Sequence, residues 1–403
     1  MILIKSIIQK NSAYTPTTFK TIILSILVLI FMGCEDDPSS QFGFEESSFN
    51  IDLFEQNIID YVNAGNNSPI GWAYTISEQG TLSKSDAFGQ ARTSSDGAIN
   101  FSENKEINIA SVTKFYTAIA VMQLLEANNL TIEDPIAPWL PASWDTDDGI
   151  DGLNFKDLLK HESGLESSNN NFDVTLGYEG LKQCIGTGVV NSQTRNYLNV
   201  NFALFRVLIP SLWDASDDTN AIDIEHDGNT QFMYLLYMQE NIFDRLQLPV
   251  VDCYPEDRNI ATLYYNVNDI NTQTNGLFYN DWNNKSGGGG YFMSAREMAV
   301  VNAYFEHTEV LVSASQRAIM KEHRLGMDRE DTSREAHNNY YGKGGSIGTG
   351  GGASVSQGVR AHIAMFPING IDCVVVMNSQ GVTFTGNTNL GQMIYDAYNN
   401  AWE

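Results

Sequence analysis

The sequence is poor in basic residues, in cysteine and in long apolar runs, and each shortage excludes a class of protein. Its 403 residues include 23 Lys and Arg against 49 Asp and Glu, a formal net charge of −26. This balance argues against nucleic-acid binding, because phosphate backbones are bound by clustered positive charge. Only four cysteines are present, and their spacing matches no metal-ligand pattern. We therefore predict neither a metal nor a cofactor.

The apolar run near the N-terminus, residues 22–32, is too short to cross a membrane as an ordinary helix. About 11 residues at about 1.5 Å each cannot span a hydrocarbon core of about 30 Å. Lys5, Lys10 and Lys20 precede the run. A positively charged start followed by a short apolar stretch is typical of a signal peptide, which we predict over residues 1–33.

The signal-like segment ends in Phe31-Met32-Gly33-Cys34, which resembles a bacterial lipobox, although Phe31 and Met32 match it imperfectly. The resemblance implies that Cys34 is lipidated and that residues 34–46 are an acidic, flexible tether. The chain after residue 33 has 20 basic and 49 acidic residues, a formal charge of −29. We expect a lipid-anchored extracytoplasmic protein, periplasmic or on the cell surface. The alternative is a plain secretory signal with an incidental cysteine.

Ser111 and Lys114 stand three residues apart, at the start of a run with apolar residues at helical spacing. Positions i and i+3 of a helix share one face, so the Lys114 ammonium can reach the Ser111 hydroxyl. A serine hydroxyl becomes a strong nucleophile when a base takes its proton, and a partly desolvated lysine can be that base. The pattern indicates nucleophilic catalysis. On this motif alone, Ser111 could equally be a helix cap.

A second S-x-x-K match, Ser102 to Lys105, occurs nine residues earlier. It lies in a charged stretch with no apolar run behind it. We therefore expect Lys105 to be solvated and Ser102 to be an ordinary serine.

Three downstream segments supply the context for Ser111. They read LLKHESGL at residues 158–165, Tyr197-Leu198-Asn199 before an apolar run, and YGKGGSIGTGGG at residues 341–352. In this order they resemble the serine beta-lactamase and penicillin-binding protein superfamily. They are most similar to its class C branch, with the related esterases, D-aminopeptidases and DD-carboxypeptidases. The resemblance covers roughly residues 50 to 403.

The resemblance implies a role for each polar residue of the motifs. Ser111 attacks a carbonyl carbon, and Lys114 takes or relays its proton. Tyr197 acts as a base if flanking lysines favour its phenolate. Asn199 hydrogen-bonds the substrate or steadies Lys114. Lys343 supplies positive charge beside Tyr197 and any substrate carboxylate.

The resemblance also assigns roles to the backbone near residue 345. Gly344 and Gly345, which lack side chains, would let substrate lie against the strand edge. The N–H groups of Ser111 and Ser346 would form the oxyanion hole. The alternative interpretation of residues 342–352 is a flexible glycine loop.

Several residues have alternative interpretations. Y-x-N also matches at Tyr61, Tyr264 and Tyr398, of which Tyr264 is the serious rival to Tyr197. The resemblance implies a structural rather than catalytic His161. Residues 145–152 are acidic and rich in glycine, but they lack the final glutamate of a calcium loop, so we expect a solvated loop.

The three cysteines beyond Cys34 allow at most one disulfide. Cys373 lies in an apolar strand pattern and is expected to be a buried free thiol. Whether Cys184 and Cys253 pair is left open by the sequence.

The patterns predict an α+β fold over residues 47–403, with an antiparallel sheet flanked by helices and no linker between domains. We expect a helix over residues 47–64, a strand from Gly71, a hairpin formed by 361–366 and 371–377, and a final helix through Leu390. Residues 136–285 would form an inserted, mostly helical lobe, in which 213–229 is polar and irregular. The active site would lie between sheet and lobe.

These observations predict an extracytoplasmic serine hydrolase that acts through an acyl-enzyme. A D-amino-acid peptide, a small ester or a beta-lactam all suit the same residues, and we favour a peptidase or esterase over a dedicated beta-lactamase. One alternative is a non-catalytic surface binding protein that keeps the fold. A glycan-binding surface lipoprotein is a third possibility.

Overall fold

Strands from both ends of the chain assemble into one sheet in the computed structural model. It describes residues 48–65, 67–146, 149–165, 177–217, 222–268, 275–328, 340–349, 356–385 and 389–403. Within these residues the strand order is β10-β5-β8-β9-β1-β2-β3, and β7, which stands outside this path, pairs with β8. The strands are β1 Gly71–Glu78, β2 Thr81–Arg92, β3 Ile99–Asn100, β5 Tyr265–Asn266, β7 Tyr341–Thr349, β8 Gln357–Phe366, β9 Ile371–Met377 and β10 Ser379–Gln380. A separate antiparallel pair is formed by β4 Ile107–Asn108 and β6 Phe292–Met293.

The predicted hairpin is confirmed as β8 and β9, with Phe366 opposite Ile371. Gly370 has a φ of +68°, a conformation that glycine adopts without the steric cost other residues bear. The predicted antiparallel sheet needs one correction. The two-residue strands β5 and β10 run parallel, so the sheet is mixed at that edge.

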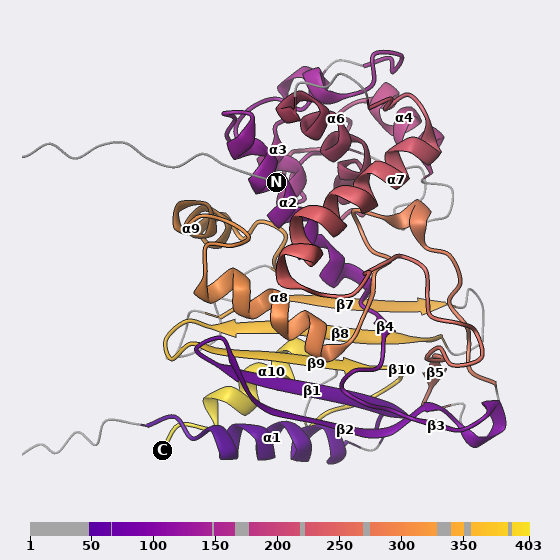
Figure 1. The fold of residues 1–403 in the computed structure, drawn as a ribbon, viewed down its shortest axis with the longest axis vertical. Helices are drawn as coiled ribbons and strands as arrows, with labels where there is room; N and C mark the ends of the chain where they lie inside the picture. The colour runs from indigo at the N-terminus through magenta and orange to yellow at the C-terminus, as the bar shows by residue number, and fades with distance from the viewer. Residues whose placement is uncertain are drawn as a thin grey trace, which may run out of the picture. The chain divides into compact units, whose positions relative to one another are not determined.

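Alternation along the central strands places apolar side chains on both faces of the sheet. On β9, Val375 packs in the cluster of Phe54 and Ile394, whereas Val374 and Val376 belong to the larger core on the opposite face. The first face is covered by α1 Ile51–Asn63 and α10 Leu390–Asn399, and the second by α8 Ala295–His307 (Figure 1). The sheet is therefore buried between two helical layers.

The helical lobe is built around α2 Thr113–Ala127, which is buried along nearly its whole length and packs against α6 Phe205–Asp217 (Figure 1). The other helices are α3 Phe155–Leu159, α4 Tyr178–Thr187, α5 Val200–Ala203, α7 Asp227–Met238 and, beside the sheet, α9 Ala314–His323. The same apolar core continues from the lobe to the sheet.

The structure differs from the predicted lobe at two places. Strand β5, inside the range 136–285, belongs to the sheet. The stretch 213–229, expected to be polar and irregular, is irregular at 222–226, but it begins in the last turns of α6 and ends in the first turn of α7. Its helical ends were not expected, and buried Leu212 and Thr230, which flank the stretch, anchor the two helices in the interior.

The ends of the chain bear on several predictions. The first helix begins at Ile51 rather than near residue 47, because the Asn50 side chain caps it by accepting the Leu53 N–H at 3.0 Å. Ser47–Glu403 form one compact unit. The predicted signal peptide, Cys34 and the tether lie outside the described residues. Among the helices that are described, none is long and apolar enough to cross a bilayer.

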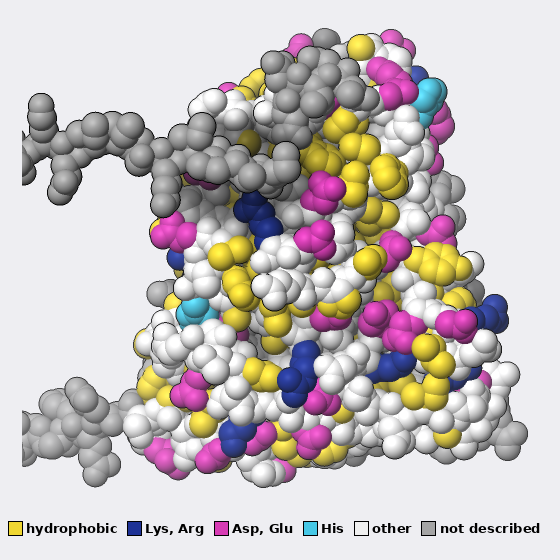
Figure 2. Space-filling model, in the orientation of Figure 1, with side chains coloured by type: hydrophobic (Ala, Val, Ile, Leu, Met, Phe, Trp, Pro, Cys, Tyr) yellow, Lys and Arg dark blue, Asp and Glu magenta, His cyan; other side chains and the backbone are white. Residues whose placement is uncertain are grey.

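The three cysteines of the described residues are all buried, and none of them is in a disulfide. Cys373 on β9 is confirmed as a buried thiol, and Cys184 and Cys253 form no disulfide. On the face shown in Figure 2, Lys and Arg side chains lie interspersed with Asp and Glu.

Candidate active site

Ser111 lies in a single 3₁₀ turn, Ala110–Val112, between strand β4 and helix α2. The preceding Ala110 has a φ of +50°, a conformation that carries steric strain in a residue other than glycine. Buried Asn108 holds this turn, because its side chain accepts the Ala110 N–H at 2.9 Å and donates to the Gly290 carbonyl at 3.3 Å. The position of Ser111 is thus enforced by buried hydrogen bonds.

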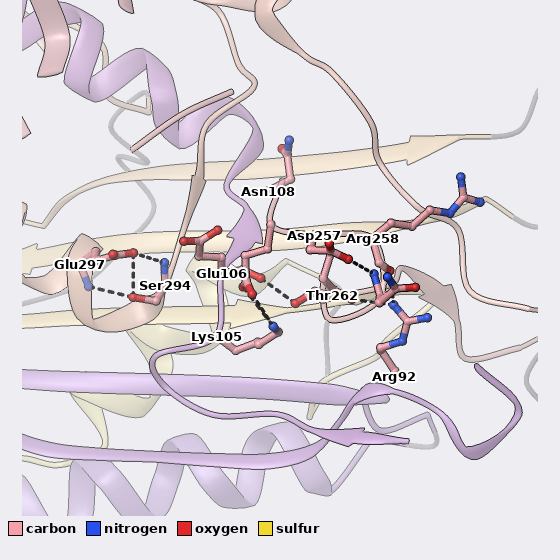
Figure 3. A network of polar contacts seen from close by, with 12 residues as sticks. Arg92, Lys105, Glu106, Asn108, Asp257, Arg258, Thr262, Ser294 and Glu297 are labelled. Carbon is pink, nitrogen blue, oxygen red and sulfur yellow. Dashed lines mark hydrogen bonds and ion pairs between the residues drawn. The ribbon is translucent and has the colours of Figure 1, made fainter. Parts of the chain in front are cut away.

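The segment that leads into this turn is also anchored from its sides. Thr262 donates its hydroxyl to the Glu106 carbonyl at 2.6 Å, and Lys105 pairs with Glu256 at 3.0 Å (Figure 3). Lys105 was expected to be solvated, but only 12 % of its side chain is exposed. Its ammonium is held in an ion pair with Glu256, so the rival motif at Ser102 has no lysine available to act as a base.

Lys114 is fully buried and its ammonium nitrogen meets three acceptors. Its Nζ lies 3.1 Å from Ser111 Oγ, 2.8 Å from Asn199 Oδ1 and 2.5 Å from the Gly288 carbonyl. Burial lowers the pKa of Lys114, against an opposing effect of Tyr197. The cap reading of Ser111 is not supported, since Val112 is the N-cap of α2 and makes no side-chain cap bond.

Tyr197 lies on the other side of Ser111. Its hydroxyl is 2.9 Å from Ser111 Oγ, and the Nζ atoms of Lys114 and Lys343 lie 5.2 Å and 4.9 Å from its ring centroid. Burial alone would raise the pKa of Tyr197, but the two lysine charges outweigh burial and lower it to about 8. A fraction of the phenol is therefore ionised near neutral pH.

His161 and Asn199 support these two groups. The His161 ring packs on Tyr197 with centroids 4.2 Å apart, and its Nδ1 lies 3.0 Å from the Leu198 carbonyl. Burial holds the pKa of His161 well below its ordinary value, so the ring is neutral. Asn199, whose two expected roles were to bind substrate or to steady Lys114, contacts Lys114 here.

Strand β7 brings Lys343 to Tyr197, and Lys343 has a partner, Asp328, that the sequence did not indicate. Lys343 is 2 % exposed and its Nζ lies 2.9 Å from Asp328 Oδ1. The other Asp328 oxygen accepts the Gly344 N–H at 2.7 Å. Burial opposes the charge on Lys343, but Asp328 and Tyr197 together raise its pKa. Asp328 follows no motif, and no spacing to Lys343 could have identified it.

Gly344 and Gly345 of β7 have a packing role that the sequence did not indicate. A Cβ on Gly345 would lie 2.2 Å from the Ile109 carbonyl and 3.1 Å from the Ser111 nitrogen. A Cβ on Gly344 would lie 3.1 Å from His362 Nδ1. These glycines let the strand approach the turn of Ser111 and the side chains behind it, and both also line the cleft, where their expected role beside substrate stays a prediction. The run is a strand as far as Thr349, not a flexible loop.

These groups surround a cleft of about 440 Å³. Its lining includes Ser111, Tyr197, Asp328, Lys343 and Ser346, with further residues from β8 and α10. A second cavity of about 440 Å³, lined by Gln123 and Trp213 among others, contains none of the predicted site residues. The structure thus brings every predicted site residue of the compact unit to one place.

The rival tyrosines are structural. Tyr264 is buried beneath the Ser111 turn, where its hydroxyl accepts the Asn108 N–H at 2.8 Å, and burial raises its pKa well above the ordinary value. Tyr61 bonds the Asn400 side chain at 2.8 Å, and Tyr398 packs in the core under α1. Only Tyr197 reaches Ser111 among the four candidates.

Metal binding finds no support in the part of the chain that the structure describes, where no three His, Cys, Asp or Glu side chains are grouped suitably. Asp147 and Asp148 of the acidic run lie outside the described residues, as does His337.

The Glu106 carboxyl should make the free energy of unfolding depend on pH. Burial, together with the charges of Glu256 and Glu297, raises its pKa to about 7. Because the folded pKa is raised, this group stabilises the fold fully below its unfolded pKa, and that contribution is lost as pH rises through about 7. Glu106→Gln cannot ionise. We expect it to be more stable than wild type at about pH 8, by about 1 kcal/mol after allowance for solvent screening.

Thermal unfolding of both proteins between about pH 5 and about pH 8 measures this effect. The two stability curves should converge at low pH and separate as pH rises. Parallel curves would show that Glu106 is not the titrating group.

The chain is similar to known proteins in sequence and in fold. The sequence matches the Beta-lactamase family over residues 70–393. No curated protein matches it. Among solved structures, a beta-lactamase/D-alanine carboxypeptidase from Yersinia pestis is 16% identical, with a TM-score of 0.61, and the match covers 87% of this chain and 98% of that one.

Two further structures share the fold. A class C beta lactamase from Rhodobacter sphaeroides is 13% identical, with a TM-score of 0.57, over 87% of this chain and 98% of the other. EstCE1, described as a hydrolase with promiscuous acyltransferase activity, is 15% identical, with a TM-score of 0.61, over 86% and 98%. The predicted beta-lactamase/transpeptidase-like fold is confirmed.

Proposed function

Because the chain belongs to the beta-lactamase family, we propose that it is a hydrolase that cleaves an acyl substrate through a covalent ester on Ser111. One observation carries the proposal. Ser111 Oγ lies within hydrogen-bond distance of both Lys114 Nζ, at 3.1 Å, and Tyr197 Oη, at 2.9 Å. A serine placed between a buried lysine and a tyrosine of lowered pKa has the two groups that nucleophilic activation requires.

Tyr197 is the base that these surroundings favour. Three oxygens accept hydrogen bonds from the Lys114 ammonium, and Tyr197 is a further hydrogen-bond partner of it. Lys114 is therefore stabilised as a cation despite its burial, and its charge in turn stabilises the Tyr197 phenolate. The phenolate takes the Ser111 proton as Oγ attacks the carbonyl carbon.

The remaining steps use the same groups. The Ser111 and Ser346 N–H groups stabilise the oxyanion, the carbon–heteroatom bond breaks, and Tyr197 gives its proton to the leaving group. Water then enters, Tyr197 takes one of its protons, and the hydroxide adds to the acyl carbon. Collapse of that adduct releases the acid and returns the proton to Ser111.

The substrate class proposed is an amide or ester, such as a D-amino-acid peptide or a small ester, with a beta-lactam as a less favoured substrate. The known proteins with this fold support this range, since their names include a D-alanine carboxypeptidase and a hydrolase with acyltransferase activity.

We further propose that Cys34 is lipidated and anchors the enzyme outside the cytoplasm, in the periplasm or at the cell surface. The short apolar run after three lysines and the residues before Cys34 support this. Metabolic labelling with radioactive palmitate should mark the wild type and not Cys34→Ser. Equal labelling of both would contradict lipidation at this residue.

Labelling with a fluorophosphonate probe tests the proposed nucleophile. Intact mass should show one adduct on wild type and on Ser102→Ala, which removes the serine of the rival motif, and none on Ser111→Ala. An adduct that persists in Ser111→Ala would place the nucleophile elsewhere. Absence of any adduct on folded wild type would favour a non-catalytic surface binding protein.

The charge of Lys343 should appear in the pH dependence of activity. The Tyr197 base is active when ionised, so kcat/KM for an ester should fall about tenfold per pH unit below the Tyr197 pKa. Lys343→Met removes one of the two charges that lower this pKa to about 8. The acid limb of the profile should therefore move to higher pH. An unmoved limb would show that another group titrates.

A further inference from the structure

Asp328 places a negative charge beside the lysine of the cleft. It contacts Lys343 Nζ at 2.9 Å through one oxygen and the Gly344 N–H at 2.7 Å through the other. Lys343 is 2 % exposed, whereas 40 % of the Asp328 side chain is exposed. The carboxylate is therefore the more accessible member of the pair, and it lines the cleft together with Ser111.

The leaving group of a substrate must lie beside this pair. In the proposed mechanism Tyr197 protonates the leaving group, which requires hydrogen-bond distance between them. Lys343 Nζ lies 4.9 Å from the Tyr197 ring centroid. A carboxylate on the leaving group would be attracted by Lys343 and repelled by Asp328 over similar distances, so the two effects oppose each other. An uncharged leaving group avoids this repulsion.

The other charged or titratable groups in the cleft lining are distributed differently. His362 lies behind Gly344, where its Nε2 meets the Tyr340 hydroxyl. Arg360 stands opposite Ser346 on β8 and donates to the Gln380 side chain at 3.2 Å and the Val382 carbonyl at 3.1 Å. Ser346 is three residues along β7 from Lys343, roughly 10 Å at strand spacing. Arg360 therefore does not replace Lys343 as the partner of a leaving-group carboxylate.

We propose, building on the function above, that Asp328 is a specificity-determining residue. Because its carboxylate is the more accessible member of the pair, it more than offsets the attraction of Lys343, and so directs the enzyme to neutral esters and amides and against leaving groups that carry a carboxylate. Peptides that end in D-alanine and bicyclic beta-lactams carry such a carboxylate. They are accordingly poor substrates, and an uncharged ester or amide is the preferred class.

A pair of esters that differ only in this charge tests the proposal. Phenyl acetate and 3-acetoxybenzoate share the acyl group, and their hydroxide-catalysed rates correct for intrinsic reactivity. The purified full chain should prefer phenyl acetate in corrected kcat/KM by about tenfold. Asp328→Asn keeps the side-chain shape and should shift the ratio toward 3-acetoxybenzoate by about tenfold or more, or about 1.4 kcal/mol.

Glu133→Gln is the matched control, because it removes one carboxylate from an ion pair with Lys156 outside the cleft. Its ester ratio should equal that of wild type. An unchanged ratio in folded Asp328→Asn would overturn the proposal. So would a wild type that cleaves both esters equally or prefers the carboxylated one, a result that needs no variant to fold.

The same experiments separate this inference from the proposed function. Fluorophosphonate labelling of Ser111 without hydrolysis of either ester would contradict the neutral-ester class alone. Absence of both labelling and hydrolysis would contradict the hydrolase itself, and the specificity inference with it.

Discussion

Ser111→Ala is expected to lower kcat/KM for phenyl acetate by about 10⁶-fold, to the level set by the remaining N–H donors and substrate binding. The alanine variant keeps the turn held by Asn108 and loses only the hydroxyl that meets Lys114 and Tyr197. Loss of the nucleophile removes the covalent route, so the remaining charged groups have no acyl acceptor to activate.

The matched control for this variant is Ser102→Ala, which removes the serine of the other S-x-x-K match. We expect it to retain wild-type kcat/KM, because Lys105 beside it is paired with Glu256. Comparable losses in both variants, or a Ser111→Ala enzyme within tenfold of wild type (about 1.4 kcal/mol), would contradict the assignment of the nucleophile.

Lys114→Met is expected to lower kcat/KM by about 10³-fold to 10⁴-fold. Methionine approximates the volume of the lysine stem but supplies neither the charge that lowers the Tyr197 pKa nor the donor to Ser111. The Asn199 and Gly288 oxygens lose a donor as well. Each buried oxygen left without a donor costs about 1 to 3 kcal/mol, so the free energy of unfolding should also fall.

Circular dichroism and thermal unfolding must accompany the kinetics of Lys114→Met, so that loss of activity is measured on folded protein. Lys156→Met serves as the control, since it removes a lysine whose ion pair with Glu133 lies outside the cleft and should leave kcat/KM within about twofold of wild type. A folded Lys114→Met enzyme with near-normal kcat/KM would show that Lys114 only fills the interior.

The local part of the site could be predicted from the sequence because it depends on local geometry. Ser111 and Lys114 are one helical turn apart, and the structure brings their side chains to 3.1 Å. Tyr197 and Lys343 lie 86 and 232 residues after Ser111, so no local rule joins them. Their prediction rested on the order of motifs in a known family. Their proximity to Ser111 is a result of the fold.

Asp328 could not be predicted, for a physical reason. Its ion pair with Lys343 forms only when β7 docks beside the turn before it, and an isolated acid in a sequence gives no signal of its future partner. For Gly344 and Gly345 the sequence predicted a close approach of substrate, and the structure adds a close approach of the chain itself. A glycine pattern indicates close approach, but only the sheet register shows that Gly345 faces the Ile109 carbonyl.

The fold shows the same division between strong and weak patterns. The hairpin of β8 and β9 combines two largely apolar runs with an Asn369-Gly370 turn, which is a strong local signal. Strand β5 has only two residues, which is too short to show the alternating pattern that predicts a strand. The end of α6 carries Asp214 and Ser216, which are partly exposed, and polarity alone was interpreted as irregular structure.

The most direct test of the account is to trap the acyl-enzyme itself. Wild-type protein mixed with phenyl acetate and quenched rapidly in acid should carry one acetyl group, and peptide mapping should place it on Ser111. Tyr197→Phe, which lacks the base for both acylation and deacylation, should form this acetyl-enzyme more slowly than wild type does and, once acylated and freed of substrate, should lose it more slowly. An acetyl group on another residue, or ester hydrolysis with no acetyl-enzyme in either protein, would contradict the Ser111 mechanism.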